Sequence, residues 1–188
     1  MKFCSQCGAP LSLRIPPGDN LLRHICDACD TVHYQNPKIV AGCIPEWQDK
    51  VLLCRRAIEP RYGLWTLPAG FMENGESAVA SAAREALEEA HAVVENLTLY
   101  GLYTLTHVNQ VYLMFRGQLK EGHASPGEES LEVALFTEAE IPWEQLAFTV
   151  VHETLQQYFA ERRTGAFSLH VGDIIREPDN RFRIHRYY

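Results

Sequence analysis

Three glutamates at helical spacing constrain this chain more than any other feature. Glu85, Glu88 and Glu89 stand at positions i, i+3 and i+4, which places their carboxylates on one face of a single helix. The pattern predicts a helix from about 77 to 90, preceded by the loop 68–70. Carboxylate oxygens on one face are the ligands that hard divalent cations prefer. The segment therefore predicts a cation site beside a cleft.

The other positions of this helix predict how it packs. Val79, Ala83, Ala86, Leu87 and Ala90 are expected on the side opposite the glutamates, against a sheet. Two further alanines, Ala78 and Ala82, are expected near the carboxylates. Their small side chains leave room for ions and substrate, although high helix propensity explains alanine equally well.

Four of the six cysteines form two identical steps, Cys4-x2-Cys7 and Cys26-x2-Cys29. Two such steps at this separation are typical of a zinc ribbon, in which four thiolates close a tetrahedral site. We expect the zinc to be structural, because a segment of about 35 residues cannot bury enough apolar surface to fold without such a staple. Disulfide bonding is the less favoured alternative, since the first residues lack the apolar run of a secretory signal.

Size and charge set wider limits. A chain of 188 residues that is 46% hydrophobic can form one main domain with a small appendage. Its net charge of -7 disfavours nucleic acid and anionic lipid as partners, because both reward a basic surface. We found no apolar stretch of membrane-spanning length and expect a cytoplasmic protein without a membrane partner.

Alternating patterns predict the remaining elements. Strands are expected at 38–44, 50–55, 64–67, 93–105, 111–119 and 131–136, a second helix at 148–163, and two extended segments between 166 and 188. Strand pairs mixed with helices in this order indicate an α/β fold in which helices cover both faces of a sheet.

The glutamate helix lies within a longer pattern that resembles the Nudix box. The matching residues are Gly70-x5-Glu76-x7-Arg84-Glu85-x2-Glu88-Glu89. With the zinc ribbon in front, the chain resembles FAD and ADP-ribose pyrophosphatases of this family, including plant plastid FAD pyrophosphatases. The closer match is carried by residues 34–38, 63–70 and 129–132. NADH pyrophosphatases are more distant, because residues 99–107 lack their Ser-Gln-Pro-Trp-Pro-Phe-Pro motif.

The resemblance implies a fold, a division of the chain and a reaction. It implies a Nudix α/β/α sandwich with a mixed sheet at 36–165, a zinc ribbon at 1–35, and an extended tail at 166–188 packed on the domain or on a partner subunit. The implied reaction is hydrolysis of a diphosphate bridge in a dinucleotide or nucleotide sugar, giving AMP and FMN from FAD, or AMP and ribose 5-phosphate from ADP-ribose. A homodimer is implied as well.

The expected site combines metal ligands with a proton acceptor. Mg²⁺, or Mn²⁺ in its place, would neutralise the phosphate charge and activate water. The expected ligands and their helper are the three glutamates, the carbonyl of Gly70, the carboxylate of Glu76, and Arg84, which holds a glutamate in place. Either Glu88 or Glu129 is expected to accept the proton of the water, with Glu88 slightly favoured.

The sequence indicates the substrate contacts less clearly than the metal ligands. Arg55, Arg56 and Arg61 precede the glycine loop and are candidates for phosphate binding. The candidates for stacking on a base are aromatic residues, although an aromatic residue in a strand is more often part of the core; they are Tyr34, Trp65, Phe71, Tyr103 and Tyr112.

One position departs from the family pattern. His91 stands where the Nudix box has a glycine that ends the helix in a left-handed conformation. Histidine adopts that conformation more readily than most residues. We therefore expect His91→Gly to raise the melting temperature and to leave turnover largely intact.

Two other functions remain open. A nucleotide sensor would keep the fold and bind without cleaving, but the intact glutamates and the lack of a recognisable helix-turn-helix segment argue against it. An RNA-end hydrolase would use the same acids on a cap-like diphosphate, with the ribbon gripping the RNA. The acidic composition disfavours this second alternative.

Overall fold

The computed structural model describes residues 1–187 and divides the chain into two compact units, Met1–Pro37 and a larger one that begins at Lys38. Each unit has its own strands.

The first unit is a small antiparallel sheet beside four cysteine side chains. Its strands are β1 (Leu11–Arg14), β2 (Arg23–Cys26) and β3 (Val32–His33), paired in the order β1-β2-β3. Each cysteine step closes as a tight turn, in which Gly8 N donates to Cys4 O at 3.0 Å and Asp30 N donates to Cys26 O at 2.8 Å. Gly8 and Asp30 both have positive φ, at 76° and 56°, as such turns require.

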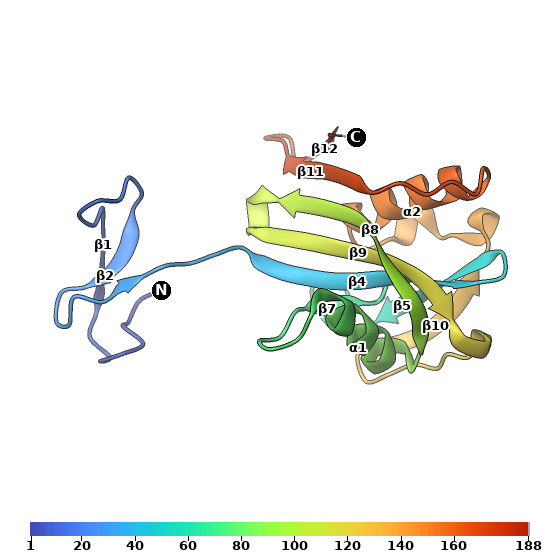
Figure 1. Ribbon diagram of the computed structural model, residues 1–188, viewed down its shortest axis with the longest axis horizontal. Helices are drawn as coiled ribbons and strands as arrows, with labels where there is room; N and C mark the ends of the chain where they lie inside the picture. Colours follow the sequence, from blue (N-terminus) through green and yellow to red (C-terminus); the bar gives the residue numbers. More distant parts are fainter. Residues whose placement is uncertain (188) are drawn as a thin grey trace. The chain divides into compact units, whose positions relative to one another are not determined.

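The second unit contains a nine-stranded mixed sheet. Seven strands form its continuous path in the order β10-β5-β4-β9-β8-β11-β12. Figure 1 shows β4, β9, β8 and β11 side by side. The seven strands are β4 (Lys38–Trp47), β5 (Lys50–Arg56), β8 (Val94–Leu105), β9 (Gln110–Leu119), β10 (Ser130–Phe136), β11 (His170–Arg176) and β12 (Phe182–Arg186). The pairs β4–β9 and β8–β11 are parallel and the others antiparallel.

Two helices, α1 (Ala78–Ala90) and α2 (Thr149–Arg162), cover opposite faces of this sheet (Figure 1). Alternation along β5 shows why. Val51 and Leu53 belong to the core cluster that includes residues of α2, whereas Leu52 and Cys54 belong to the cluster that includes residues of α1. The predicted α/β/α sandwich with a mixed sheet is thereby confirmed.

The packed face of α1 differs from the prediction. Ala82, Ala86 and Ala90 are fully buried against the sheet, whereas Val79 and Leu87 are 45% and 49% exposed. The expectation that Val79 and Leu87 face the sheet was wrong, because a stripe of methyl groups at i, i+4 and i+8 lets the helix lie close to the strands. Ala82 consequently fills the interface and leaves no room for a ligand.

The sheet opens in front of α1. Strands β4 and β5 pair only near their hairpin, and two short strands, β6 (Trp65–Thr66) and β7 (Ala69–Phe71), pair with β5 and β4 beyond it. The segment predicted as a loop at 68–70 is thus partly a strand. A Cβ atom on Gly42 of β4 would lie 2.3 Å from Ala69 Cβ, so only glycine permits this close pairing.

The C-terminal segment is integrated into the sheet as β11 and β12. Arg186 of β12 forms a double ion pair with Glu153 of α2, whose side chain is buried, at 2.6 and 2.9 Å. Short 3₁₀ turns lie in the connections β8–β9, β9–β10 and β10–α2; they are Thr106–Val108, Lys120–Gly122, Glu138–Glu140 and Trp143–Gln145. Across residues 1–187 we found no helix with the length and apolar character that crossing a membrane requires.

Candidate active site

One cavity of about 1010 Å³ lies where the sheet opens, bordered by α1 and by the loops around it. Four of its lining residues form an acidic cluster, Glu85, Glu88, Glu89 and Glu129. Another group, which we call the apolar lining, consists of Ile58, Leu105, Val108, Tyr112 and Phe148. A cavity of this size accommodates a dinucleotide.

A cap residue fixes the start of α1, and a glycine fixes the position of one of its carboxylates. Ser77 caps the helix, and its Oγ accepts a hydrogen bond from Ala80 N at 3.2 Å. A Cβ atom on Gly70 would lie 2.4 Å from the carboxylate atoms of Glu85. Glycine at position 70 is therefore a steric requirement for the position of the Glu85 carboxylate.

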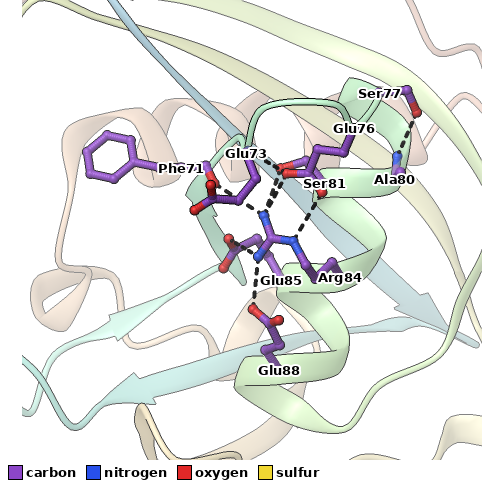
Figure 2. A network of polar contacts seen from close by, with 9 residues as sticks. All are labelled: Phe71, Glu73, Glu76, Ser77, Ala80, Ser81, Arg84, Glu85 and Glu88. Carbon is purple, nitrogen blue, oxygen red and sulfur yellow. Dashed lines mark hydrogen bonds and ion pairs between the residues drawn. The ribbon is translucent and has the colours of Figure 1, made fainter.

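Arg84 is the hub of the polar network (Figure 2). Its Nε and Nη2 donate to the two carboxylate oxygens of Glu76, at 3.1 and 2.8 Å. Its Nη1 donates to Glu85 Oε1 at 2.7 Å and to Glu88 Oε2 at 2.9 Å. Nη2 also donates to the carbonyl of Phe71 at 3.2 Å, which ties the guanidinium to β7. One side chain thus sets the positions of three carboxylates.

Both carboxylate oxygens of Glu76 are engaged in hydrogen bonds. Both of its oxygens accept hydrogen bonds from Arg84, and Oε1 also accepts one from Glu73 N at 2.6 Å. These contacts, Arg84 first, lower the pKa of Glu76 to about 2. Glu76 does not line the cavity. In this structure both oxygens of Glu76 are thus engaged by Arg84 and Glu73, and its part in holding a metal stays a prediction.

Glu85 and Glu89 are buried and Glu88 is exposed. Burial raises the pKa of Glu85, and the guanidinium of Arg84 opposes that rise. Burial, and then the charge of Glu85, raise the pKa of Glu89 to about 8. Carboxylates held this close together suit a divalent cation, whose charge would relieve their repulsion.

The structure brings some of the proposed substrate residues to the cavity. Arg56, Phe71 and Tyr112 line it, and the guanidinium of Arg56 lies 5.2 Å from the ring centre of Phe148. Phe71 is 46% exposed, and the Nζ atom of Lys38 lies over its ring at 4.6 Å from the ring centre.

Other predicted substrate residues lie elsewhere. Arg55 and Arg61 are not among the lining residues, and Arg55 donates to the carbonyl of Gly63 at 2.9 Å. Trp65 and Tyr103 belong to the buried core, where Trp65 packs edge-on against a neighbouring ring. Tyr34 belongs to the first unit and packs under the guanidinium of Arg23.

Sequence reasoning missed several residues of the cavity. Glu128 and His91 line it beside the acidic cluster, and Phe148, Gln110 and His107 line it as well. The adjacency of Glu128 to Glu129 was a usable signal for the first. His91 was marked as the departure from the box glycine, but not as a cavity residue. Phe148, Gln110 and His107 come from separate loops and strand ends, and no local pattern in the sequence marks them.

The cysteine cluster forms a second site. The sulfur atoms of Cys4, Cys7, Cys26 and Cys29 all lie within 4.8 Å of one another, with Cys4–Cys29 at 3.7 Å and Cys7–Cys26 at 3.4 Å. Four thiolates around zinc at about 2.3 Å stand about 3.8 Å apart, so the cluster fits a tetrahedral zinc ion. Hydrogen bonds from the hydroxyl and backbone of Thr31 lower the pKa of Cys29, whereas hydrogen bonds with the neighbouring thiols Cys26 and Cys29 raise that of Cys7, so without a metal the cluster shares protons among its thiols.

Family models match both units. A model described as Nudix N-terminal, a zinc ribbon, matches residues 2–35, and the NUDIX domain model matches residues 36–159. The crystal structure of a NUDIX hydrolase from Nitrosomonas europaea is 58% identical, with a TM-score of 0.86 over 92% of this chain and 99% of that one.

More distant relatives differ in length or share only the fold. The NAD-capped RNA hydrolase NudC of Photobacterium profundum is 29% identical over 145 residues, which are 74% of this chain and 51% of that protein. The chain thus spans about half the length of this curated relative. The NUDIX domain of Shewanella oneidensis NrtR, solved with ADP ribose, is 19% identical with a TM-score of 0.57 over 67% of this chain and 90% of that one, a likeness of fold alone.

Proposed function

Because the chain belongs to the Nudix family and carries its N-terminal zinc ribbon, we propose that it is a pyrophosphohydrolase that cleaves the diphosphate bridge of a dinucleotide or nucleotide sugar. One observation carries this proposal. The acidic cluster and the apolar lining border the same cavity. A substrate could therefore place its diphosphate bridge at cations held by the acids and its flat base against the apolar lining.

The reaction requires a divalent cation, Mg²⁺ or Mn²⁺. Glu85, Glu88 and Glu89 would hold it, assisted by the carbonyl of Gly70, which also borders the cavity. A bound cation supplies charge neutralisation of the diphosphate and activation of the attacking water. Burial, and then the charge of Glu85, raise the pKa of Glu89, and this supports the assignment because a bound cation would offset both effects.

The protein side chains supply orientation and a proton acceptor. Arg84 holds Glu85 and Glu88 at 2.7 and 2.9 Å and so presets the donor set before substrate arrives. Its contact occupies Oε2 of Glu88 and leaves Oε1 to accept a proton from water. Glu129 enters the same cavity from a different loop and is the other candidate acceptor.

The substrate's other groups have partners in the cavity. We assign phosphate contact to the guanidinium of Arg56. The rings of Phe71, Tyr112 and Phe148 are the ones placed to stack on a base or a flavin. Arg55, Arg61 and Trp65 do not share in this assignment, since they do not border the cavity.

FAD and ADP-ribose are the proposed substrates, giving AMP with FMN or with ribose 5-phosphate. A second candidate is the diphosphate of an NAD-type RNA end. The name of the Photobacterium relative supports it, although the net charge of -7 argues against extended contact with RNA. The presence of NAD-capped RNA in that name also weakens the expectation that nucleic acid is an unlikely partner.

A single assay series tests the proposal. Hydrolysis of FAD, ADP-ribose, NADH and NAD-capped RNA is measured with Mg²⁺ and with Mn²⁺, and kcat/KM is compared. Glu85→Gln combined with Glu89→Gln should abolish every activity. Binding of a nucleotide without turnover by the wild type would instead indicate a sensor. A rate that is equal in the double variant would overturn the proposal.

The resemblance to homodimeric members also leads us to propose a dimer in the cytoplasm. Light scattering behind size-exclusion chromatography gives the mass directly. A particle of about twice the chain mass of 21.4 kDa is expected, and a monomer at all concentrations would contradict the dimer.

A further inference from the structure

A histidine ends helix α1 in a conformation that favours glycine. His91 has φ 45° and ψ 30°, in the left-handed region, and its backbone N–H donates to Leu87 O at 2.9 Å. Glycine meets this backbone requirement with less strain. The side chain at position 91 must therefore be explained by its contacts and not by the helix end.

That side chain reaches the loop that carries Glu129. His91 Nδ1 lies 3.1 Å from Ser125 Oγ, at hydrogen-bonding distance. The backbone of the loop, residues 123–129, also docks on the end of the helix. Ser125 N donates to Ala90 O at 2.9 Å, and Gly127 N donates to Glu89 O at 3.0 Å. These bonds satisfy carbonyls that the last helical turn leaves free.

The fit between loop and helix is close. A Cβ atom on Gly127 would lie 1.7 Å from the carbonyl oxygen of Glu88, so the loop backbone packs directly on α1. Two residues later, Glu129 O accepts a hydrogen bond from Ala57 N at 2.8 Å. His91, Glu128 and Glu129 all border the cavity. The loop is therefore held at both ends, and Glu128 and Glu129 border the cavity beside the glutamates of α1.

We propose that His91 is a positioning residue, which fixes loop 123–129 through Ser125 and thereby holds Glu129 at the acidic cluster. The inference rests on the proposed function for its effect on turnover. Its structural half, the attachment of the loop, stands independently of any reaction. It also revises the expectation that His91→Gly leaves turnover intact, because that substitution improves the helix end and removes the link to Ser125.

The test separates the helix end from the loop. In the full chain, His91→Gly should keep or raise the melting temperature, while the amides of Ser125 and Gly127 exchange with deuterium faster than in the wild type. With Mg²⁺, kcat should fall about threefold to tenfold at unchanged KM, the scale of a small misplacement of a reacting group.

Matched variants make the result specific. Ser125→Ala should reproduce the faster amide exchange and the lower kcat while leaving the helix end unchanged. The double variant should exchange no faster and turn over no more slowly than either single variant, and Ser125→Thr should keep the wild-type exchange and kcat. Asn96→Gly is the control, since Asn96 also has positive φ, at 57°, but does not border the cavity.

Two results would overturn the inference. Unchanged exchange of residues 123–129 in His91→Gly would show that the side chain does not hold the loop. A loss of kcat in His91→Gly that Ser125→Ala does not share would mean that His91 acts on the substrate directly. Absence of hydrolysis by the wild type would refute the proposed function but leave the exchange experiment intact.

Discussion

At the scale of single residues, the glutamates of α1 and Glu76, which precedes the helix, differ in what surrounds them. Both carboxylate oxygens of Glu76 accept hydrogen bonds from Arg84, and the carboxylate of Glu85 packs closely on Gly70. Glu89 is buried, whereas only Oε2 of Glu88 accepts a hydrogen bond from Arg84. Identical side chains therefore have different chemistry, because desolvation and hydrogen bonding set the affinity of each for a proton.

The first prediction concerns the proton acceptor. Glu88→Gln and Glu129→Gln each remove one candidate, and the variant that loses more kcat at saturating Mg²⁺ with little change in KM identifies the acceptor. We expect the larger loss in Glu88→Gln, because Glu88 lies on the same helix as Glu85 and Glu89. Equal, small losses in both variants would exclude both residues from proton transfer.

The second prediction uses the raised pKa of Glu89. Without a cation its folded pKa is about 8 and its ordinary value is 4.5, so between these values the folded protein holds a proton that the unfolded chain has released. This contribution to stability is complete below pH 4.5 and is lost as pH rises through about 8. Glu89→Gln should remove this contribution to the pH dependence of stability, because glutamine does not titrate.

The measurement is a series of melting temperatures without metal. The variant should gain several degrees on the wild type at about pH 9 and little at about pH 5. Adding Mg²⁺ should then stabilise the wild type more than the variant. Parallel curves for the two proteins would show that Glu89 is not protonated at neutral pH.

The sequence predicted the acidic residues better than their partners. Spacing alone places Glu85, Glu88 and Glu89 on one face, because a helix repeats every 3.6 residues. The two oxygens of Glu76 could not be assigned in this way, since the Arg84 fork that occupies them depends on the path of the chain between the two residues. Phe148 reaches the cavity from a distant segment and was not foreseeable.

At the scale of elements, α1 is the part whose placement decides the site. Its alanine stripe lies on the sheet, so Glu85 and Glu89 are buried at the edge of the same interface. A larger side chain in that stripe would lift the helix from β4. The acidic cluster would then move away from Gly70.

The third prediction follows from this packing. Ala82→Leu should destabilise the protein by about 1–3 kcal/mol, because the site is filled and the added atoms force the backbone to shift. The kcat of Ala82→Leu should fall by more than the loss of folded protein accounts for. Ala80→Leu is the control, since Ala80 is exposed on the same helix. Equal effects of the two substitutions on denaturant unfolding and on kcat would contradict the close packing.

Element predictions failed where tertiary pairing outweighs local pattern. Val79 and Leu87 are apolar yet exposed, because small residues rather than large ones give the close approach of helix to sheet. The turn-like residues Ala69 and Gly70 form strand β7 because β4 offers free hydrogen-bonding groups beyond its hairpin with β5. The long strands and α2, by contrast, were predicted within a few residues.

At the scale of the whole molecule, the two units depend on different forces. The second unit has two large core clusters, one on each face of its sheet. In the described part of the first unit the buried apolar side chains are Pro16, Ile25 and two cysteines of the cluster, Cys4 and Cys26. Such a core cannot offset the loss of chain entropy, so we expect the first unit to fold only with its metal.

The fourth prediction is that loss of zinc unfolds the first unit and spares the second. In Cys26→Ser the zinc content should fall from one ion per chain to none, and the amides of β1 and β2 should exchange rapidly. The hydrolysis of a free dinucleotide with Mg²⁺ should stay at the wild-type rate, because all residues assigned to that reaction lie beyond Pro37. Cys54→Ala is the matched control, since Cys54 is buried in the sheet and should keep its zinc. A rate that falls in proportion to the zinc content would instead show that the ribbon supplies part of the active site.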